Sequence, residues 1–292
     1  MEEVSSNSVI LTEWNASSKF LDPCKLSKTW LSKAISIISE TTELAENVEI
    51  GPYSIIGPKV KIGKNTKIHS HVSIIGDTSI GNGNEIFPFT SIGTPPQDLK
   101  YKGEKNSLVI GDNNKFREYV NINPGTEQGG GITKIGNNNL FMVYCHVAHD
   151  CKISNNIVLA NNVQVGGHVN IQDNAIIGGS CAIHQFSRIG ESAMIGGMTG
   201  VLSDVIPYGL SLGNRNNLVG LNLIGLRRSK ISNANIKVLQ EAYNIIFKSE
   251  NFRSNIDNLN SEIKSNEYVS KIINFINSDK KRPISLPIYI KW

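Results

Sequence analysis

The amino-acid sequence predicts a parallel β-helix followed by a small helical domain, and three observations support this fold class. Aliphatic residues recur at every sixth position, glycine follows many of them, and the next positions favour the turn residues Asn, Lys and Pro. Each six-residue unit therefore predicts a short strand and a turn. Because one unit cannot bury its apolar face alone, the units are expected to stack on their neighbours.

The repeat begins abruptly near Leu44 and then holds its register without exception. Its first series consists of Ile50, Ile56, Ile62, Ile68, Ile74, Ile80, Ile86 and Ile92. An α-helix would need apolar spacings of three and four, and a meander of hairpins would not keep one register for so long. The strict period of six therefore favours the β-helix.

Two insertions interrupt the repeat. A polar segment that begins with two prolines, residues 94–104, precedes Ile110, Phe116 and Ile122, and a glycine-rich segment, residues 128–131, forms the second break. The last series consists of Ile135, Phe141, Val147, Ile153, Leu159, Val165, Ile171, Ile177, Ile183, Ile189, Ile195 and Val201. Small residues stand two places before several of these anchors, as a narrow tube interior requires: Ala175, Cys181, Ser187 and Ala193.

The two ends of the chain have a different pattern. Residues 1–34 show no clean period, and we expect an arm whose role the sequence does not reveal. The β-helix domain is predicted over residues 35–210, and a connector with a helical domain over residues 211–292, ending near Pro283. Three stripes at helical spacing predict the helices: Val238, Leu239, Ala242, Tyr243, Ile246 and Phe247; Ile256, Leu259 and Ile263; and Val269, Ile272, Ile273 and Ile276.

Composition limits the class of protein. The 292 residues are 39% hydrophobic, enough for a real core, and the formal charge of +4 is too small to indicate nucleic-acid binding. The cysteines Cys24, Cys145, Cys151 and Cys181 lack CxxC spacing, so we expect reduced thiols. No apolar stretch reaches the roughly 18 residues of a transmembrane segment. We expect a cytoplasmic protein and leave an organellar location open.

The segment from His146 to Asp150 is the candidate chemical centre. If three units make one coil, residues 18 apart stack along the tube at about 4.8 Å. His149, Gly167 and Gln185 then form one column, with His168 and His184 beside it and His146 on the same coil as His149. The column supplies a candidate base, a carboxylate in Asp150, and a glycine whose N–H is open to a developing oxyanion.

A base, a carboxylate and an oxyanion donor together suit acyl transfer, and two other interpretations of this column compete with it. A single histidine at a β-helix turn is usually a solvated hydrogen-bonding group, but four of the six histidines of the chain meet here. Histidine is also a frequent zinc ligand. We favour proton transfer because Asp150 adjoins a single candidate base, and we expect neither a metal nor a cofactor.

The chain resembles the UDP-N-acetylglucosamine O-acyltransferases that open lipid A biosynthesis, over about residues 44–250. The matching segments are Gln97-Asp98-Leu99-Lys100-Tyr101, Gly125-Thr126, Gln128-Gly129-Gly130-Gly131, His146-Val147-Ala148-His149-Asp150-Cys151, Leu159-Ala160-Asn161-Asn162, Gly167-His168-Val169, Ile176-Ile177-Gly178-Gly179, His184-Gln185-Phe186 and Gly225-Leu226-Arg227-Arg228. The loop at Gln97 and the block at His146 are specific to this family, whereas the bare repeat is shared with other hexapeptide proteins.

The resemblance implies a left-handed β-helix that assembles as a homotrimer, with active sites between adjacent subunits. It implies that the chain transfers a 3-hydroxyacyl group from acyl carrier protein to the 3-hydroxyl of UDP-N-acetylglucosamine. His149 would be the general base, Asp150 would orient it, and the N–H of Gly167 would hold the oxyanion.

The same resemblance implies roles in substrate binding and chain-length selection. The expected contacts to the sugar, its phosphates and the nucleotide are Asp98, Lys100, His146, His168, His184, Gln185, Asn222 and Arg228. Gly197 stands where the family limits acyl length, and a glycine there suggests a longer chain.

The chain departs from the family pattern at three places. It has Asn123-Pro124 where a basic residue is usual, Ile224 where a glutamate is common, and Gly213-Asn214-Arg215 in place of Gly-Asn-His. An N-acyltransferase acting on a UDP-amino sugar and a metal-binding or structural β-helix therefore remain as alternatives. Acyl length, the acceptor atom and the role of residues 1–34 stay open.

Overall fold

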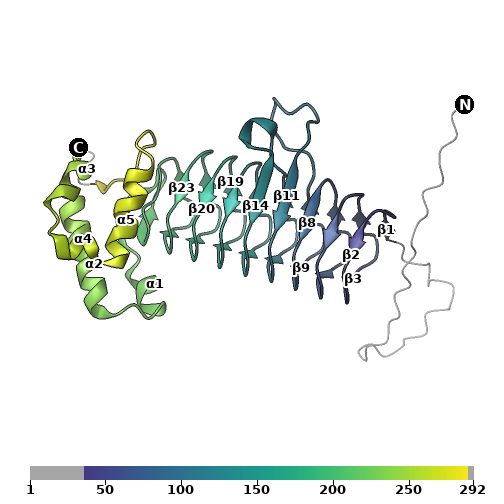
Figure 1. Ribbon diagram of the computed structural model, residues 1–292, viewed down its shortest axis with the longest axis horizontal. Coiled ribbons are helices and arrows are strands. Elements are labelled where there is room, and N and C mark those ends of the chain that lie inside the picture. The colour runs from purple at the N-terminus through teal and green to yellow at the C-terminus, as the bar shows by residue number, and fades with distance from the viewer. Residues whose placement is uncertain (1–35, 289–292) are drawn as a thin grey trace, which may run out of the picture.

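The structure, a computed structural model, describes residues 36–288 and confirms the predicted fold class. A left-handed parallel β-helix forms a long tube, and helices gather at its C-terminal end (Figure 1). Two loops project from one side of the tube beside β11 and β14, where the sequence predicted insertions (Figure 1). The arm predicted over residues 1–34 lies outside the described residues.

Three parallel sheets form the sides of the tube. Sheet A consists of β1 (Ile37–Ile38), β4 (Ile55–Ile56), β7 (Ser73–Ile74), β10 (Ser91–Ile92), β13 (Asn121–Ile122), β16 (His146–Val147), β19 (Gln164–Val165), β22 (Ala182–Ile183) and β25 (Gly200–Val201). Sheet B consists of β2 (Glu43–Leu44), β5 (Lys61–Ile62), β8 (Thr78–Ile80), β11 (Ser107–Ile110), β14 (Ile132–Ile135), β17 (Lys152–Ile153), β20 (Asn170–Ile171) and β23 (Arg188–Ile189). Sheet C consists of β3 (Glu49–Ile50), β6 (Lys67–Ile68), β9 (Glu85–Ile86), β12 (Lys115–Phe116), β15 (Leu140–Phe141), β18 (Val158–Leu159), β21 (Ile176–Ile177), β24 (Met194–Ile195), β26 (Gly209–Leu212) and β27 (Asn217–Leu221).

Residues 18 apart pair between uninterrupted coils, as the three-unit coil predicted. Val147 pairs with Val165, and Val165 with Ile183. Because a strand alternates its side chains, the aliphatic second residue of most strands points inward and the first points outward. The inward side chains are almost completely buried, so they form one continuous core along the tube.

The turns between sheets depend on the left-handed backbone conformation. The second turn residue has a positive φ in coil after coil, for example 58° at Asn156 and 62° at Asn174. Asn and Asp enter this region at lower cost than other residues that have a Cβ. Asp150 (φ 60°) and His168 (φ 61°) occupy the same kind of position, so the turn geometry fixes where two candidate site residues stand.

The corners of the tube are filled by small side chains. Cys145, Cys151 and Cys181 are buried free thiols at these positions, while Cys24 lies outside the described residues. Burial raises the pKa of the Cys145 thiol to about 11 and that of Cys151 to about 12. Both thiols therefore stay protonated near neutral pH and act as packing groups.

The C-terminal region differs from the sequence prediction in two ways. Residues expected to form a connector instead form the antiparallel pair β26 and β27, which extends sheet C. The helices are α1 (Leu223–Arg228), α2 (Asn233–Ile246), α3 (Phe252–Asn255), η3 (Ile256–Asn258), α4 (Ser261–Ser265) and α5 (Glu267–Ser278). The stripe through Ile256, Leu259 and Ile263 is thus not one helix. Leu259 is extended, and the side chain of Asn260 caps a new helix by accepting from the N–H of Ile263.

A buried carboxylate attaches the C-terminal segment to the tube. Asp204 accepts from Nε of Arg188 at 2.6 Å and from Nε of Arg282 at 2.9 Å, and its side chain has no exposed surface. This contact joins β23 to the segment that follows α5.

Within residues 36–288, no helix has the length and apolar character needed to cross a bilayer.

The Asp204→Asn variant should be strongly destabilised, by about 3–5 kcal/mol, because the substitution leaves two largely buried guanidinium groups without their anion. The Glu43→Gln variant is the matched control. Its ion pair with Lys61 is more than half exposed on both sides, so its loss should change the stability far less than the loss of Asp204. The midpoints of urea unfolding measure both, and equal shifts would contradict the prediction.

Candidate active site

His149 and Asp150 form the turn at which the chain passes from sheet A to sheet B. In the next coils, Gly167 with His168 and Gln185 with Phe186 occupy the same turn. Backbone hydrogen bonds tie these turns together, from the N–H of His168 to the carbonyl of His149 and from that of Phe186 to the carbonyl of Gly167, both at 2.9 Å. The predicted column is therefore present.

The imidazole of His149 is oriented by the carboxylate that follows it. Its Nδ1 lies 2.7 Å from Oδ2 of Asp150, whose side chain is 1% exposed. An ionised carboxylate only accepts hydrogen bonds, so Nδ1 carries the proton and Nε2 is left with its lone pair. This tautomer can accept a proton at Nε2, as a general base must.

Gly167 lies directly against the imidazole. A Cβ at this position would stand 2.6 Å from Cε1 of His149 and 2.8 Å from Nε2, so any side chain would displace the ring. Within residues 36–288 the N–H of Gly167 donates to no acceptor. In the same described range the N–H of Gln185 is likewise unpaired, but Gly167 adjoins the imidazole of His149, which makes it the better candidate for an oxyanion donor.

The first inserted loop brings Asp98 to the free face of His149. Oδ2 of Asp98 lies 4.0 Å from Nε2, and its side chain is 24% exposed. Two acceptors at this separation leave room for donors of a bound ligand between them. Lys100 is exposed on the same loop, where its N–H donates to Oδ1 of Asp98 at 3.0 Å.

Two further histidines surround the base in different ways. His168 packs edge-on against His149, with ring centroids 5.0 Å apart, and stacks on Phe186. His146 lies on β16, and its Nδ1 is 2.8 Å from Oδ1 of Asn121. Burial lowers the pKa of both His146 and His168, although the carboxylate of Asp150 partly opposes the change at His168. Both rings are thus neutral hydrogen-bonding groups near pH 7.

The remaining predicted residues do not contact His149 within the described chain. His184 and Gln185 are exposed on the next coil but one, and Nδ1 of His184 lies 3.0 Å from the carbonyl oxygen of Gln185. Gly197 follows β24 at the turn between sheets C and A. Asn222 caps α1 by accepting from the N–H of Gly225 and also donates to the carbonyl of Ser192.

Asn222 and Arg228 border an apolar hollow of about 680 Å³ on sheet C, whereas His149 stands between sheets A and B. The hollow is lined largely by Ile176, Met194, Leu210, Leu221, Leu223 and Ile224. One chain therefore presents His149 on one edge and an apolar surface beside Arg228 on another.

The donor atoms of His149, Asp150 and His168 lie within 4.8 Å of one another, which is a possible metal-ligand set. However, Oδ2 of Asp150 already accepts from Nδ1 of His149 and from the hydroxyl of Thr126, both at 2.7 Å. A metal at this oxygen would have to replace both donors. The observed hydrogen bonding suits an acid–base pair better than a metal centre.

Sequence reasoning missed the residues that hold Asp150. The N–H of Asp150 donates to the hydroxyl of Thr133 at 2.8 Å, and Thr126 binds its carboxylate. Thr126 and Thr133 flank the second insertion. Thr133 stands two places before the anchor Ile135, where the repeat favours a small residue, whereas Thr126 precedes the break in the register. The break in the repeat located this segment, but no spacing related it to Asp150.

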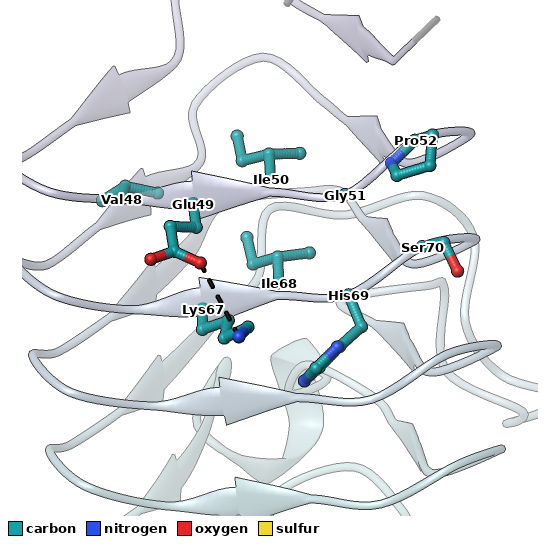
Figure 2. Close-up of a pocket in the computed structure, with 9 residues that line it drawn as sticks. All are labelled: Val48, Glu49, Ile50, Gly51, Pro52, Lys67, Ile68, His69 and Ser70. Carbon is teal, nitrogen blue, oxygen red and sulfur yellow. Dashed lines mark ion pairs between the residues drawn. The ribbon is translucent and has the colours of Figure 1, made fainter. Parts of the chain in front are cut away.

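Another hollow, of about 580 Å³, lies far from His149. Figure 2 shows it along β3 and β6, with the ion pair between Glu49 and Lys67 and with His69 at its edge. These strands belong to the first two coils and His149 to the sixth, about 20 Å along the tube. The residues that line this hollow are therefore too far from His149 to contact a group bound there.

Family models match two parts of the chain. One described as Udp N-acetylglucosamine O-acyltransferase, Domain 2, matches residues 204–285, and one described as Bacterial transferase hexapeptide (six repeats) matches residues 41–76.

Similar proteins cover most of the chain. The acyl-[acyl-carrier-protein]–UDP-N-acetylglucosamine O-acyltransferase of Sinorhizobium fredii is 43% identical over 253 residues, which is 86% of this chain and 94% of that protein. Its namesake from Aliarcobacter butzleri is 46% identical over 246 residues, or 84% and 95%. The solved structure of LpxA from Acinetobacter baumannii is 44% identical with a TM-score of 0.81, covering 85% of this chain and 97% of that one. The Arabidopsis UDP-N-acetylglucosamine acyltransferase is 32% identical with a TM-score of 0.77, covering 86% and 98%.

The lowered pKa values of His146 and His168 predict a loss of stability in mild acid. As pH falls through about 6.5, the unfolded chain takes up protons at these positions before the folded chain does. The free energy of unfolding therefore decreases until the folded histidines titrate. The His146→Asn variant removes one contribution, so its melting temperature should fall less between pH 7.5 and 5.5 than that of wild type.

The His184→Asn variant is the control for this prediction, because His184 is exposed and should leave the slope unchanged. A His146→Asn protein with the same slope as wild type would contradict the prediction.

Proposed function

The chain belongs to the acyl-[acyl-carrier-protein]–UDP-N-acetylglucosamine O-acyltransferase family, and we propose that it performs the family's reaction, the first step of lipid A biosynthesis, with His149 as the base. The protein is an acyltransferase. The acyl donor is a 3-hydroxyacyl thioester of acyl carrier protein, and the acceptor is the 3-hydroxyl of UDP-N-acetylglucosamine. The observation that carries this proposal is the 2.7 Å bond between His149 and Asp150 beside the unpaired N–H of Gly167.

The reaction begins with proton transfer to His149. Nε2 takes the proton of the sugar hydroxyl while the hydroxyl oxygen attacks the thioester carbonyl carbon. The carbonyl oxygen becomes an oxyanion and accepts from the N–H of Gly167. When the C–S bond breaks, the imidazolium returns its proton to the departing thiolate. Asp150 stabilises the imidazolium and does not itself take the proton.

We propose substrate contacts for the polar side chains around His149 and for those beside sheet C. Asp98 accepts from a donor of the sugar beside Nε2, and Lys100 contributes positive charge on the same loop. His146, His168, His184 and Gln185 complete the sugar pocket. Arg228 meets the nucleotide phosphates, because a guanidinium can bind two phosphate oxygens at once. Asn222 lies beside this arginine.

Acyl length is set where Gly197 stands. The glycine has no side chain to narrow the adjoining surface, and we propose that the enzyme takes a longer acyl chain on this account. The apolar hollow beside Arg228 is a further surface suited to an acyl tail.

The His149→Ala variant should lose acyl transfer by about 10²–10⁴-fold, because no other group in the site can accept the proton at the same place. The His69→Ala variant is the matched control, since its histidine lies on the second coil and contacts Glu85. A mass-spectrometric assay with UDP-N-acetylglucosamine and acyl carrier protein thioesters measures both. A His149→Ala enzyme that remains folded and keeps the wild-type rate would refute the base.

The active site is completed by a second copy of the chain in a homotrimer. The outward residues of sheet B are mostly charged: Glu43, Lys61, Ser79, Val109, Lys134, Lys152, Asn170 and Arg188. Sheet A carries no charged residue at its outward positions: Ile37, Ile55, Ser73, Ser91, Asn121, His146, Gln164, Ala182 and Gly200. Sheet C is apolar in its C-terminal half, at Leu140, Val158, Ile176, Met194 and Leu210.

These three faces support a ring in which sheet A of one copy packs on sheet C of the next. Such packing brings the Arg228 of one copy toward the His149 of its neighbour and leaves sheet B in water. We also propose a cytoplasmic location, to which the buried, free thiols of the described chain are suited.

Co-expression of His149→Ala and Arg228→Ala chains should restore activity that neither variant has alone. In each mixed trimer, about one third of the sites receive an intact His149 from one copy and an intact Arg228 from the next. Purified hetero-oligomers carrying two different tags measure the recovery. No recovery above the two separate variants would place both residues in one chain and overturn this arrangement.

A further inference from the structure

The carboxylate of Asp150 is held by more than its histidine. Its Oδ2 accepts from Nδ1 of His149 and from the hydroxyl of Thr126, both at 2.7 Å, and its Oδ1 accepts from the N–H of Thr126 at 2.9 Å. Thr126 is 3% exposed. An ionised carboxylate has no hydrogen to donate, so the Thr126 hydroxyl must be the donor. One threonine thus supplies two of the three hydrogen bonds to this anion.

The second insertion is folded as a cap on this carboxylate. The capping segment starts just before the insertion, at Thr126, turns through η2 (Glu127–Gly129) and closes when the N–H of Gly131 donates to the carbonyl of Thr126 at 2.7 Å. A Cβ at Gly129 would overlap Cγ of Asp150, so this position has no room for a side chain. The loop therefore depends on a glycine that lets its backbone lie against the carboxylate.

The backbone of Asp150 is fixed from the other end of the insertion. Its N–H donates to the hydroxyl of Thr133 on β14, and its φ of 60° lies in the left-handed region. Backbone and side chain of Asp150 are therefore both held by residues that flank the insertion. Neither threonine contacts Nε2 of His149 by any described hydrogen bond.

We propose that Thr126 is a positioning residue for the acyl-transfer reaction, acting on His149 through Asp150. The inference rests on the proposed function of His149. Its hydroxyl holds the carboxylate turned toward Nδ1, which keeps the proton of the imidazole at Nδ1 and leaves Nε2 free. The same bond withdraws charge from Oδ2, so it limits how strongly the carboxylate favours the imidazolium.

Other ionisable groups face this pair and are unchanged in the variants below. Asp98 lies 4.0 Å from Nε2 of His149, and Nε2 of His168 lies 3.9 Å from Oδ2 of Asp150. Lys152 borders the same hollow as Asp150. A displacement of the pH profile between variants therefore reports the lost hydroxyl.

The Thr126→Val variant tests the proposal, because it removes the hydroxyl but keeps the shape and the backbone N–H. We expect kcat to fall by about 10–100-fold with little change in either KM. The acidic limb of the kcat/KM profile should move to higher pH, because the carboxylate that has lost this hydrogen bond attracts the proton on the ring more strongly. Thr126→Ser should restore most of the rate and the wild-type profile.

The Thr90→Val variant is the matched control. Thr90 is also buried, and its hydroxyl donates to the carbonyl of Arg117, away from Asp150. It should reproduce any general effect of losing a buried hydroxyl without moving the pH profile. If valine at position 126 prevents folding, Thr126→Ala removes the same hydroxyl in a smaller side chain and is read in the same way.

A double variant separates an effect through Asp150 from a direct one. Thr126→Val should cost little further activity in an Asp150→Asn background, because the group through which it acts has already changed. Additive losses, or a Thr126→Val enzyme with the kcat and pH profile of Thr90→Val, would overturn the proposal. An active His149→Ala enzyme would instead refute the proposed function, so the two failures are distinguishable.

Discussion

The stacking of coils at an 18-residue interval is the constraint on which the rest of the structure depends. Each strand contributes one inward aliphatic, and its backbone pairs with the strands 18 residues before and after it wherever no insertion intervenes. Because successive coils cannot slip without exposing these side chains, the register is fixed along the whole tube. The outward and turn residues inherit this order, so His149, Gly167 and Gln185 are placed by the packing of Val147, Val165 and Ile183.

The site arises where that regularity is broken. The regular turn aligns His149 with Gly167, but a regular turn alone supplies neither a buried anion nor a group facing Nε2. The first insertion brings Asp98 to the free face of the imidazole. The second covers the carboxylate of Asp150 with Thr126 and Gly129. The rigid repeat thus aligns His149 with Gly167, and two irregular loops at the same edge add the groups that surround His149 and Asp150.

The sides of the tube differ in what they offer to a partner. The charged outward residues of sheet B are stabilised by hydration, so burying them would cost free energy. The uncharged row of sheet A and the apolar half of sheet C can leave water at little cost in free energy. His149, the proposed base, stands on one edge of sheet A, and Arg228 stands beside sheet C. These two residues lie on different sides of one chain but would meet across the contact between two copies, which is the physical basis of the shared site that we propose.

The sequence by itself determined the fold and the column around the base. A period of six is visible because each six-residue unit buries one aliphatic residue, such as Ile177 or Ile183. The interval of 18 follows because three units make one coil of the three-sided tube. Only the tertiary structure shows three other features: the hydrogen bonds from Thr126 to Asp150, the approach of Asp98 to His149, and the hairpin of β26 and β27. The broken helix at Leu259 also escaped prediction, because a cap at Asn260 overrode an apolar stripe. Insertions and caps follow local hydrogen bonding, which leaves no period in the sequence, and for that reason only the tertiary structure could place them.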